Sequence, residues 1–187
     1  PYGEDDCVLW RTDIPTTSGG SSGSGHGVRA VAAQDEFGAD GELRTYVWVG
    51  NGAGRIFKLD GETGEILLET NFPMDRSPYA PYGMAIDASG NLWLGGLMRH
   101  FGRIDTNRCV DDASCNVAPC AGESAECDAA IKQILTLPSG GGYGMTVDFM
   151  QRVWIAGGGG IKRYDPRAPI GSRLIYAGPS TSCNGVG

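Results

Sequence analysis

Short apolar runs recur along the chain, and each is followed by a turn sequence rich in Gly, Asn and Asp. Asp60-Gly61-Glu62-Thr63-Gly64 and Asp87-Ala88-Ser89-Gly90-Asn91 are two such turn sequences. Gly, Asn and Asp are the residues that tight turns select, and short apolar runs between them are typical of strands. The pattern therefore predicts many short β-strands joined by tight turns.

These strands recur as a repeat. The strand Tyr82-Gly83-Met84-Ala85-Ile86-Asp87 is echoed by Tyr143-Gly144-Met145-Thr146-Val147-Asp148, and a tryptophan follows each of these Asp residues by six positions. A strand that ends in Asp comes next, and a strand that ends in Pro closes the unit. The tryptophans of the three units are Trp48, Trp93 and Trp154, and the Asp residues that end the third strands are Asp60, Asp105 and Asp165.

The closing prolines give the length of the repeat. They stand at positions 15, 73, 138 and 179, and their shortest interval is 41 residues. A period of about 40–45 residues with four strands per unit is the signature of a β-propeller blade. One blade cannot bury both of its faces, so neighbouring blades pack on each other, and we expect the repeated tryptophans to fill the layers between blades.

We therefore expect an all-β fold, a propeller of four-stranded blades. Three full blades are predicted at about residues 27–73, 80–138 and 143–179. A partial blade at 1–15 and the start of another at 183–187 flank them. Propellers close with about four to eight blades, so we expect a fragment of a six- or seven-bladed ring.

The alternative is a four-bladed ring in which the two ends of the chain build one composite blade. In that ring Cys7 and Cys183 could meet and bond. In a larger ring these two cysteines would lie too far apart, since bonded Cα atoms lie within about 7 Å, and their partners would be other residues.

The stretch Pro81–Leu94, followed by Phe101-Gly102-Arg103-Ile104-Asp105, resembles repeats of the virginiamycin B lyase-like and NHL propellers. Those repeats carry a P-x-G-(I/V)-x-x-(D/G)-x-x-G-N-(L/V)-W strand pair and then a G-(R/K)-I-x-(R/K)-(I/F) strand. The resemblance covers about residues 27–179 and implies the propeller fold.

The activity that the resemblance implies is that of the lyases, which open a macrolactone by elimination. They use His, Glu and a divalent metal in the central funnel of the propeller. In the lyases the tryptophan strand continues into F-T-E. This chain has Leu94-Gly95-Gly96 there, with Val49-Gly50-Asn51 and Ile155-Ala156-Gly157 in the other two units. No catalytic residue can therefore be carried over from the family.

Composition excludes several classes of protein. Gly accounts for 31 of the 187 residues, which argues against a mainly helical fold because each Gly in a helix interior costs about 1 kcal/mol. The formal net charge is −7 and no basic patch is visible, so we expect no nucleic-acid partner. No apolar run approaches the roughly 18 residues that cross a bilayer, so we expect no transmembrane segment.

Four of the six cysteines lie in one acidic loop at residues 109–127. They are Cys109, Cys115, Cys120 and Cys127. Zinc modules usually show C-x2-4-C pairs, and only the middle pair of this loop has that spacing, so we expect two internal disulfides whose pairing stays open. Disulfides point to a secreted, periplasmic or cell-surface protein. The loop is either a decorated surface loop or a protrusion that binds a partner or a cation.

No catalytic constellation is visible. His26 and His100 are the only histidines, and both are expected to be surface or hydrogen-bonded residues. The recurrent Asp residues are expected to cap backbone N–H groups in turns, with calcium binding as the alternative. These residues are Asp60, Asp87, Asp105, Asp148 and Asp165. No D-x-D-x-D-G loop is present, so no cofactor is predicted.

Together these features predict a non-catalytic, secreted or surface-exposed propeller that acts as a binding or structural scaffold. The loop at 109–127 is its candidate interaction site, with a protein or a glycan as the ligand. The alternative is a metal-dependent lyase or lactonase-type enzyme whose catalytic residues lie mostly outside this segment. Self-assembly through sheet edges or loops is a third possibility.

Overall fold

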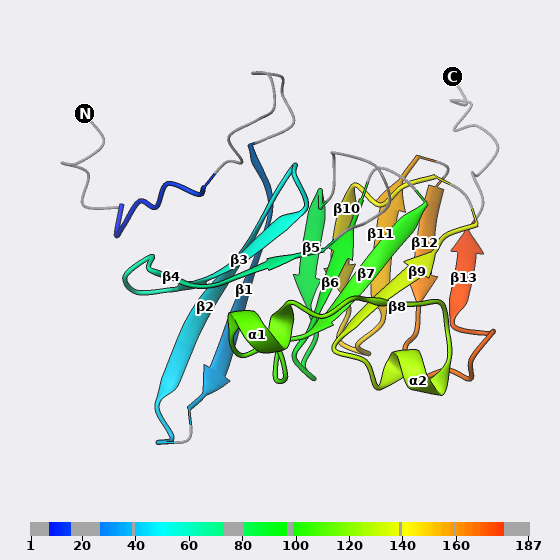
Figure 1. Ribbon diagram of the computed structural model, residues 1–187. Coiled ribbons are helices and arrows are strands. Elements are labelled where there is room, and N and C mark those ends of the chain that lie inside the picture. The colour runs from blue at the N-terminus through cyan, green and yellow to red at the C-terminus, as the bar shows by residue number, and fades with distance from the viewer. Residues whose placement is uncertain are drawn as a thin grey trace, which may run out of the picture.

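The computed structural model describes residues 8–15, 27–38, 40–72, 81–96, 99–138, 140–158 and 160–177. Nearly all of its regular structure is β. The strands form three sheets that follow one another along the chain, as Figure 1 shows. In each sheet, four strands pair antiparallel.

We call them sheets 1, 2 and 3. Sheet 1 holds β1 (Val28–Phe37), β2 (Leu43–Asn51), β3 (Arg55–Asp60) and β4 (Ile66–Asn71). Sheet 2 holds β5 (Gly83–Ile86), β6 (Asn91–Gly95), β7 (His100–Asp105) and β9 (Lys132–Thr136), with the two-residue strand β8 (Cys120–Ala121) added parallel to β9. Sheet 3 holds β10 (Gly144–Val147), β11 (Val153–Gly157), β12 (Gly160–Tyr164) and β13 (Leu174–Ala177).

The three sheets stand side by side with their first strands adjacent. β1 contacts β5, and β5 contacts β10 (Figure 1), while the fourth strand of each sheet is separated from the first by the two strands between them. This is the arrangement of consecutive propeller blades, so the repeat in the sequence corresponds to a propeller-like repeat in the fold. The described residues form an arc of three sheets and no closed ring.

Two short helices interrupt the β structure. α1 (Asp112–Cys115) and α2 (Ala125–Asp128) both lie between β7 and β9, in residues 106–131, which we call the cysteine loop. Neither helix nor β8 is predictable from the sequence, because four-residue helices and two-residue strands leave no periodic pattern.

Residues 8–15, expected to form the closing strand of a partial blade, form no strand. They lie instead over one face of sheet 1. Trp10 Nε1 donates to the carbonyl of Gly61 at 2.8 Å, and Thr12 Oγ1 donates to the carbonyl of Gly64 at 2.6 Å. Gly64 has φ +72°, and a Cβ there would lie 2.5 Å from the Trp10 ring, so glycine is required on both counts. Among the described residues, no strand lies beside this segment to pair with its backbone.

Two of the three repeated tryptophans fill the layers between sheets. Trp48 is fully buried and packs in one cluster with Met84 and Leu92 of sheet 2. Trp93 is 1% exposed and packs with Val153 and Tyr164 of sheet 3. Side chains of this size supply much of the apolar area that is buried between sheets.

The third tryptophan, Trp154, is not enclosed between two sheets of the described residues. Trp154 is only partly buried, and with Met145 and Ile161 it lines an apolar hollow of about 440 Å³ on sheet 3. No sheet among the described residues covers that hollow. The same repeat position therefore has different surroundings in sheet 2 and in sheet 3.

This difference predicts unequal effects of the same substitution. Trp93→Ala should lower the free energy of unfolding by about 3–5 kcal/mol, because it opens a cavity between two sheets. Trp154→Ala should cost clearly less, because its ring is already in contact with solvent. Equilibrium denaturation in urea, followed by circular dichroism, measures both. Equal losses, or a larger loss for Trp154→Ala, would contradict the assignment of Trp93 to the layer between sheets.

Candidate functional site: the cysteine loop

The cysteine loop, residues 106–131, connects β7 to β9 and contains two disulfides. Cys109 bonds Cys115 with Cα atoms 4.7 Å apart, and Cys120 bonds Cys127 with Cα atoms 5.1 Å apart. The expectation of two internal disulfides is confirmed, and the structure supplies the pairing that spacing left open. Cys109 and Cys115 are fully buried and belong to the same core cluster as Trp48, so the first disulfide packs between sheets 1 and 2.

Helix α1 is fixed at its start by a reciprocal pair of hydrogen bonds. The Asp111 carboxylate accepts from the backbone N–H of Ser114 at 2.7 Å, and the Ser114 hydroxyl accepts from the backbone N–H of Asp111 at 3.1 Å. This is a capping box, which satisfies donors that a helix start leaves unpaired. The hydrogen bond from the Ser114 backbone N–H is the main reason why the pKa of Asp111 lies below its usual range.

Helix α1 contacts the outer edge of sheet 1. Asp112 Oδ1 accepts from the backbone N–H of Glu69 at 2.9 Å, and the Cys115 carbonyl accepts from Thr70 Oγ1 at 2.9 Å. Glu69 and Thr70 lie in β4, the last strand of the sheet, and no strand in the described part of the chain pairs with its outer edge. The loop therefore covers an edge that would otherwise be open to pairing with another chain.

A buried lysine extends this contact. Lys132 of β9 is 1% exposed, and its Nζ donates to Thr70 Oγ1 at 2.7 Å and to the Asn71 carbonyl at 2.8 Å. Burial lowers the pKa of Lys132 to about 8, because the charged ammonium is removed from water. The Thr70 hydroxyl of sheet 1 therefore bonds both Lys132 of sheet 2 and the Cys115 carbonyl of the loop.

The second half of the loop binds its own sheet. Strand β8 pairs parallel with β9, and Gln133 Nε2 donates to the Gly122 carbonyl at 2.9 Å. Arg103 Nη2 lies 2.7–3.2 Å from three carbonyls near the end of α2. These belong to Cys127, Asp128 and Ala130. A cation suits this position, since the last carbonyls of a helix have no partner within the helix.

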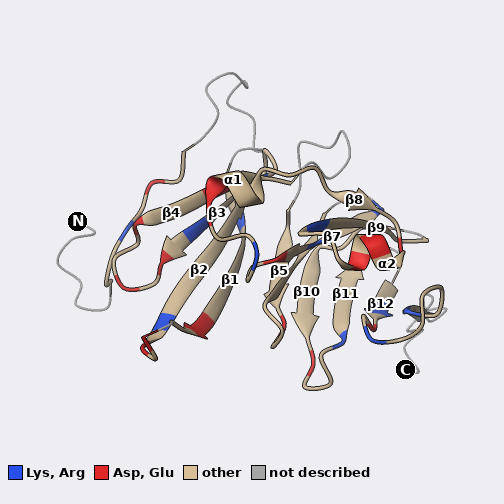
Figure 2. Cartoon of the chain, turned by 60° about the horizontal axis from the view of Figure 1, so that its bottom comes forward, with Lys and Arg blue, Asp and Glu red and all other residues tan. Residues whose placement is uncertain are grey.

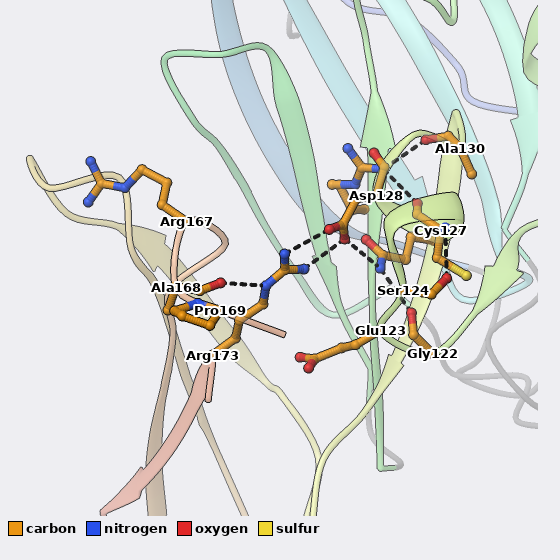
Figure 3. Close-up of polar contacts among 12 residues, drawn as sticks. Gly122, Glu123, Ser124, Cys127, Asp128, Ala130, Arg167, Ala168, Pro169 and Arg173 are labelled. Atoms are coloured by element: carbon orange, nitrogen blue, oxygen red, sulfur yellow. Dashed lines mark hydrogen bonds and ion pairs between the residues drawn. The ribbon is translucent and has the colours of Figure 1, made fainter. Parts of the chain in front are cut away.

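Helix α2 also binds sheet 3. The two carboxylate oxygens of Asp128 accept from Nη1 and Nη2 of Arg173, each at 2.7 Å, as Figure 3 shows. The Arg173 side chain is 9% exposed, and its Nε donates to the Ala168 carbonyl at 3.0 Å. Glu123 Oε2 accepts from the backbone N–H of Gly171 at 3.1 Å. Arg173 holds the pKa of Asp128 below its usual range.

The loop thus contacts all three sheets: sheet 1 through α1, sheet 2 through β8 and Arg103, and sheet 3 through α2. Of the two alternatives for its shape, the protrusion is not what the structure shows, because the loop lies against the sheets (Figure 1). Its carboxylates are largely bonded within the chain. These are Asp111, Asp112, Glu123 and Asp128.

The recurrent Asp residues fall into two structural groups. Those that end the third strands accept from the backbone N–H two residues later, at 2.9–3.2 Å. They are Asp60, Asp105 and Asp165. Asp87 and Asp148 cap their turns and also accept from the indole N–H of Trp93 and Trp154, at 2.9 and 2.8 Å. Arg152 holds the pKa of Asp148 far below its usual range.

Sheet 1 replaces this carboxylate with an amide. Gln34 Oε1 accepts from Trp48 Nε1 at 2.7 Å, and Gln34 Nε2 donates to Thr106 Oγ1 at 2.9 Å at the start of the cysteine loop. Gln34 is 6% exposed. The sequence repeat does not reveal Gln34, because the equivalent residue in the other two sheets is an Asp in a turn, whereas Gln34 lies within a strand.

The remaining candidates lie apart from one another. His100 Nδ1 lies 3.3 Å from Thr136 Oγ1. Within the described ranges, no group of three or more His, Cys, Asp or Glu side chains is placed to hold a metal ion. His26, Cys7 and Cys183 lie outside the described residues. No helix in the described part of the chain is long and apolar enough to cross a membrane.

Comparison with known proteins shows likeness in structure only. No family model and no curated protein matches the chain. A solved structure of a protein of unknown function from Bacteroides caccae matches with a TM-score of 0.51 and 14% sequence identity over 90% of this chain. The chain spans 50% of that structure, and at this identity the likeness concerns the fold alone. BamB from Moraxella catarrhalis matches 65% of the chain at 20% identity, with a TM-score of 0.36, and the match covers 34% of BamB.

The ion pair between the loop and sheet 3 should stabilise the protein. Asp128→Asn should lower the free energy of unfolding by about 1–3 kcal/mol at pH 7, because it leaves the buried Arg173 guanidinium without its anion. The pKa of Asp128 is lowered in the folded state, so this stabilisation is present above the ordinary carboxyl range and is lost as the pH falls through the lowered pKa. Thermal and urea unfolding at pH 7 and pH 3 measure it.

Glu126→Gln is the matched control, since Glu126 is an exposed carboxylate on the same helix. We expect it to change the stability by less than about 0.5 kcal/mol. If the two variants lose the same stability, α2 is not held to sheet 3 by Asp128.

The lowered pKa of Lys132 predicts that the stability of the protein also depends on pH in the alkaline range. Its pKa is about 8 in the folded protein and about 10.4 in an unfolded chain, so between these values the unfolded state binds more protons and stability rises with pH. Lys132→Met removes the titrating group. The stability of the native protein relative to Lys132→Met should therefore rise between pH 7 and pH 10.5, by up to about 3 kcal/mol. A difference that stays constant over this range would show that Lys132 is not desolvated.

Proposed function

We propose that this chain is part of a non-catalytic propeller scaffold that binds a macromolecular partner. The observation that supports it best is the cysteine loop, which contacts all three sheets through two disulfide-held halves. A loop bonded in this way fixes neighbouring sheets relative to one another. A surface that keeps one shape loses little conformational freedom when a partner binds.

The polar chemistry of the described residues supports a scaffold over an enzyme. The recurrent Asp side chains are engaged in turns or with tryptophan N–H groups, and four of the five loop carboxylates are engaged with backbone N–H groups or with Arg173. A catalytic acid or base needs a proton or lone pair that can reach a substrate. Here each repeated carboxylate has a structural contact that accounts for its presence.

The two disulfides support a secreted, periplasmic or cell-surface location, because disulfides persist in oxidising compartments. For the fold, we propose a six- or seven-bladed ring of the virginiamycin B lyase-like and NHL type. Support comes from the repeated strand pair, in which an Asp at the turn and a Trp six residues later are joined by a hydrogen bond in two sheets.

The cysteine loop also exposes two apolar side chains to solvent. Val110 and Val117 are 65% and 39% exposed, and neither side chain belongs to the core clusters that hold the loop. We therefore assign the candidate interaction site of the loop to these two outward side chains rather than to its carboxylates.

Cross-linking in the source cell tests this proposal. The native protein and a Val110→Ser/Val117→Ser variant are cross-linked with a water-soluble carbodiimide, and the products are purified and identified by mass spectrometry. A carbodiimide joins exposed carboxylates to the amines of a partner, whereas the three lysines of this chain are at most 9% exposed. A binding scaffold should yield one major macromolecular partner, and the variant should recover it at least about tenfold less, because hot-spot residues carry most of the binding energy. The variant should unfold at the same temperature as the native protein.

Two outcomes would contradict the proposal. Recovery of the same partner by both proteins would remove the loop from the interaction. Opening of a macrolactone or a simple lactone by the purified protein, dependent on Mg²⁺, Mn²⁺ or Ca²⁺ and abolished by a chelator, would favour the lyase or lactonase alternative.

A further inference from the structure

We infer that a groove between sheets 1 and 2 is a docking site for a basic protein segment that carries an apolar residue. The inference rests on the proposed scaffold function and names a partner chemistry for it. The groove has a volume of about 510 Å³ and lies between the end of β1 and the turn after β5. Its polar lining residues are Gln34, Asp35, Glu36, Asp87, Ser89 and Asn107.

One wall of the groove is an unusually long hairpin. β1 and β2 stay paired from Val28↔Asn51 to Phe37↔Leu43, whereas the first two strands of sheets 2 and 3 pair over four residues each. The β1–β2 hairpin therefore extends past the ends of the other sheets, which Figure 1 shows at its lower left. A wall built on two paired strands is more rigid than a loop, so the groove is preformed.

The floor of the groove is fixed by buried hydrogen bonds. Gln34 bonds Trp48 and Thr106, and Asp87 bonds Trp93 and its own turn. Both side chains are less than a tenth exposed. Asn107 Nδ2 donates to the Ser89 carbonyl at 2.8 Å, which ties the start of the cysteine loop to the opposite wall.

The charge at the groove is negative. Asp35 is exposed, and within the described residues its carboxylate accepts from the Thr45 hydroxyl at 2.6 Å. Glu36 Oε1 lies 3.7 Å from Lys58 Nζ, so Lys58 offsets this one carboxylate. In the hairpin itself, Arg44 is paired with Asp40, and Arg29 lies over the Tyr82 ring. Asp35 and Asp87 therefore keep the groove anionic.

The end of the molecule that surrounds the groove is also negatively charged. It consists of the connections β1–β2, β3–β4, β5–β6, β7–β9, β10–β11 and β12–β13, which Figure 2 brings forward. Of the 18 acidic residues in the described part of the chain, twelve lie in these connections: Asp40, Glu42, Glu62, Glu65, Asp87, Asp111, Asp112, Glu123, Glu126, Asp128, Asp148 and Asp165. Of the 14 basic residues in the same described ranges, four lie in the connections: Arg108, Arg152, Arg167 and Arg173. Such a field steers cationic partners toward this end and repels nucleic acid and anionic membranes.

An apolar anchor stands beside the groove. Phe37 and Leu43 are directly opposed at the tip of the hairpin and are 76% and 56% exposed. Phe37 follows the groove residue Glu36 in the same strand. Exposed aromatic and aliphatic side chains rimmed by charge are typical of protein-binding surfaces. The fitting occupant therefore places Lys or Arg in the groove and an apolar side chain against Phe37 and Leu43.

A peptide titration tests this site. The probe is the synthetic peptide acetyl-LRKLRK-amide, and its control is acetyl-LEELEE-amide. Isothermal titration calorimetry at 50 and 300 mM NaCl should give saturable, salt-sensitive binding of the basic peptide alone. Asp35→Asn/Glu36→Gln should weaken binding at least about tenfold, and Phe37→Ser/Leu43→Ser should weaken it at both salt concentrations.

Glu62→Gln/Glu65→Gln is the matched control, because it removes two carboxylates from the same end but outside the groove lining. It should change the affinity by less than about twofold. Equal losses in both charge variants, or no saturable binding of the basic peptide up to 1 mM, would overturn the groove assignment. Neither result bears on the scaffold proposal, which the cross-linking experiment tests separately.

Discussion

The structure depends on burying apolar side chains between neighbouring sheets. Each sheet presents two faces and cannot remove both from water by itself. Trp48 and Trp93 meet this constraint, since each is fully enclosed by its own sheet and the next one along the chain. The indole N–H of each finds an acceptor on the first strand or its turn, Gln34 or Asp87, so a large apolar ring is buried without leaving a donor unpaired. The adjacent first strands and the arc of sheets follow from this packing.

The cysteine loop adds polar and covalent contacts to that apolar packing. Its first disulfide lies inside the layer between sheets 1 and 2, and its second holds the helix whose Asp128 binds sheet 3. Hydrophobic layers resist separation of the sheets but fix their relative position only loosely, whereas directional hydrogen bonds and a bidentate ion pair specify it. The loop also leads into the proposed groove, because Thr106 and Asn107 bond residues on both of its walls. The same segment thus connects the frame of the molecule to its candidate binding surface.

Much of the fold could be predicted from the sequence, because the repeat reports the packing directly. The tryptophan spacing and the turn Asp residues recur because each sheet has to bury an apolar face, and the second copy makes the pattern visible in the sequence. The contacts of the cysteine loop could not be predicted, because they occur once. Nothing in the spacing of Cys109, Cys115, Cys120 and Cys127 distinguishes the pairings, and Asp128 and Arg173 are 45 residues apart with no motif around either. Residues 8–15 match the closing strands in sequence, but a strand also needs a neighbour to pair with, and sequence similarity does not supply one.

Native-state hydrogen exchange, measured amide by amide, tests the central claim that the cysteine loop makes the three sheets one mechanical unit. If it does, the most protected amides of β3, β7 and β12 should exchange with the same free energy of opening, because no sheet can open without the others. If the amides of β12 exchange with a free energy several kcal/mol below those of β3 and β7, sheet 3 opens independently. The contacts of Asp128 and Glu123 would then not hold the sheets together.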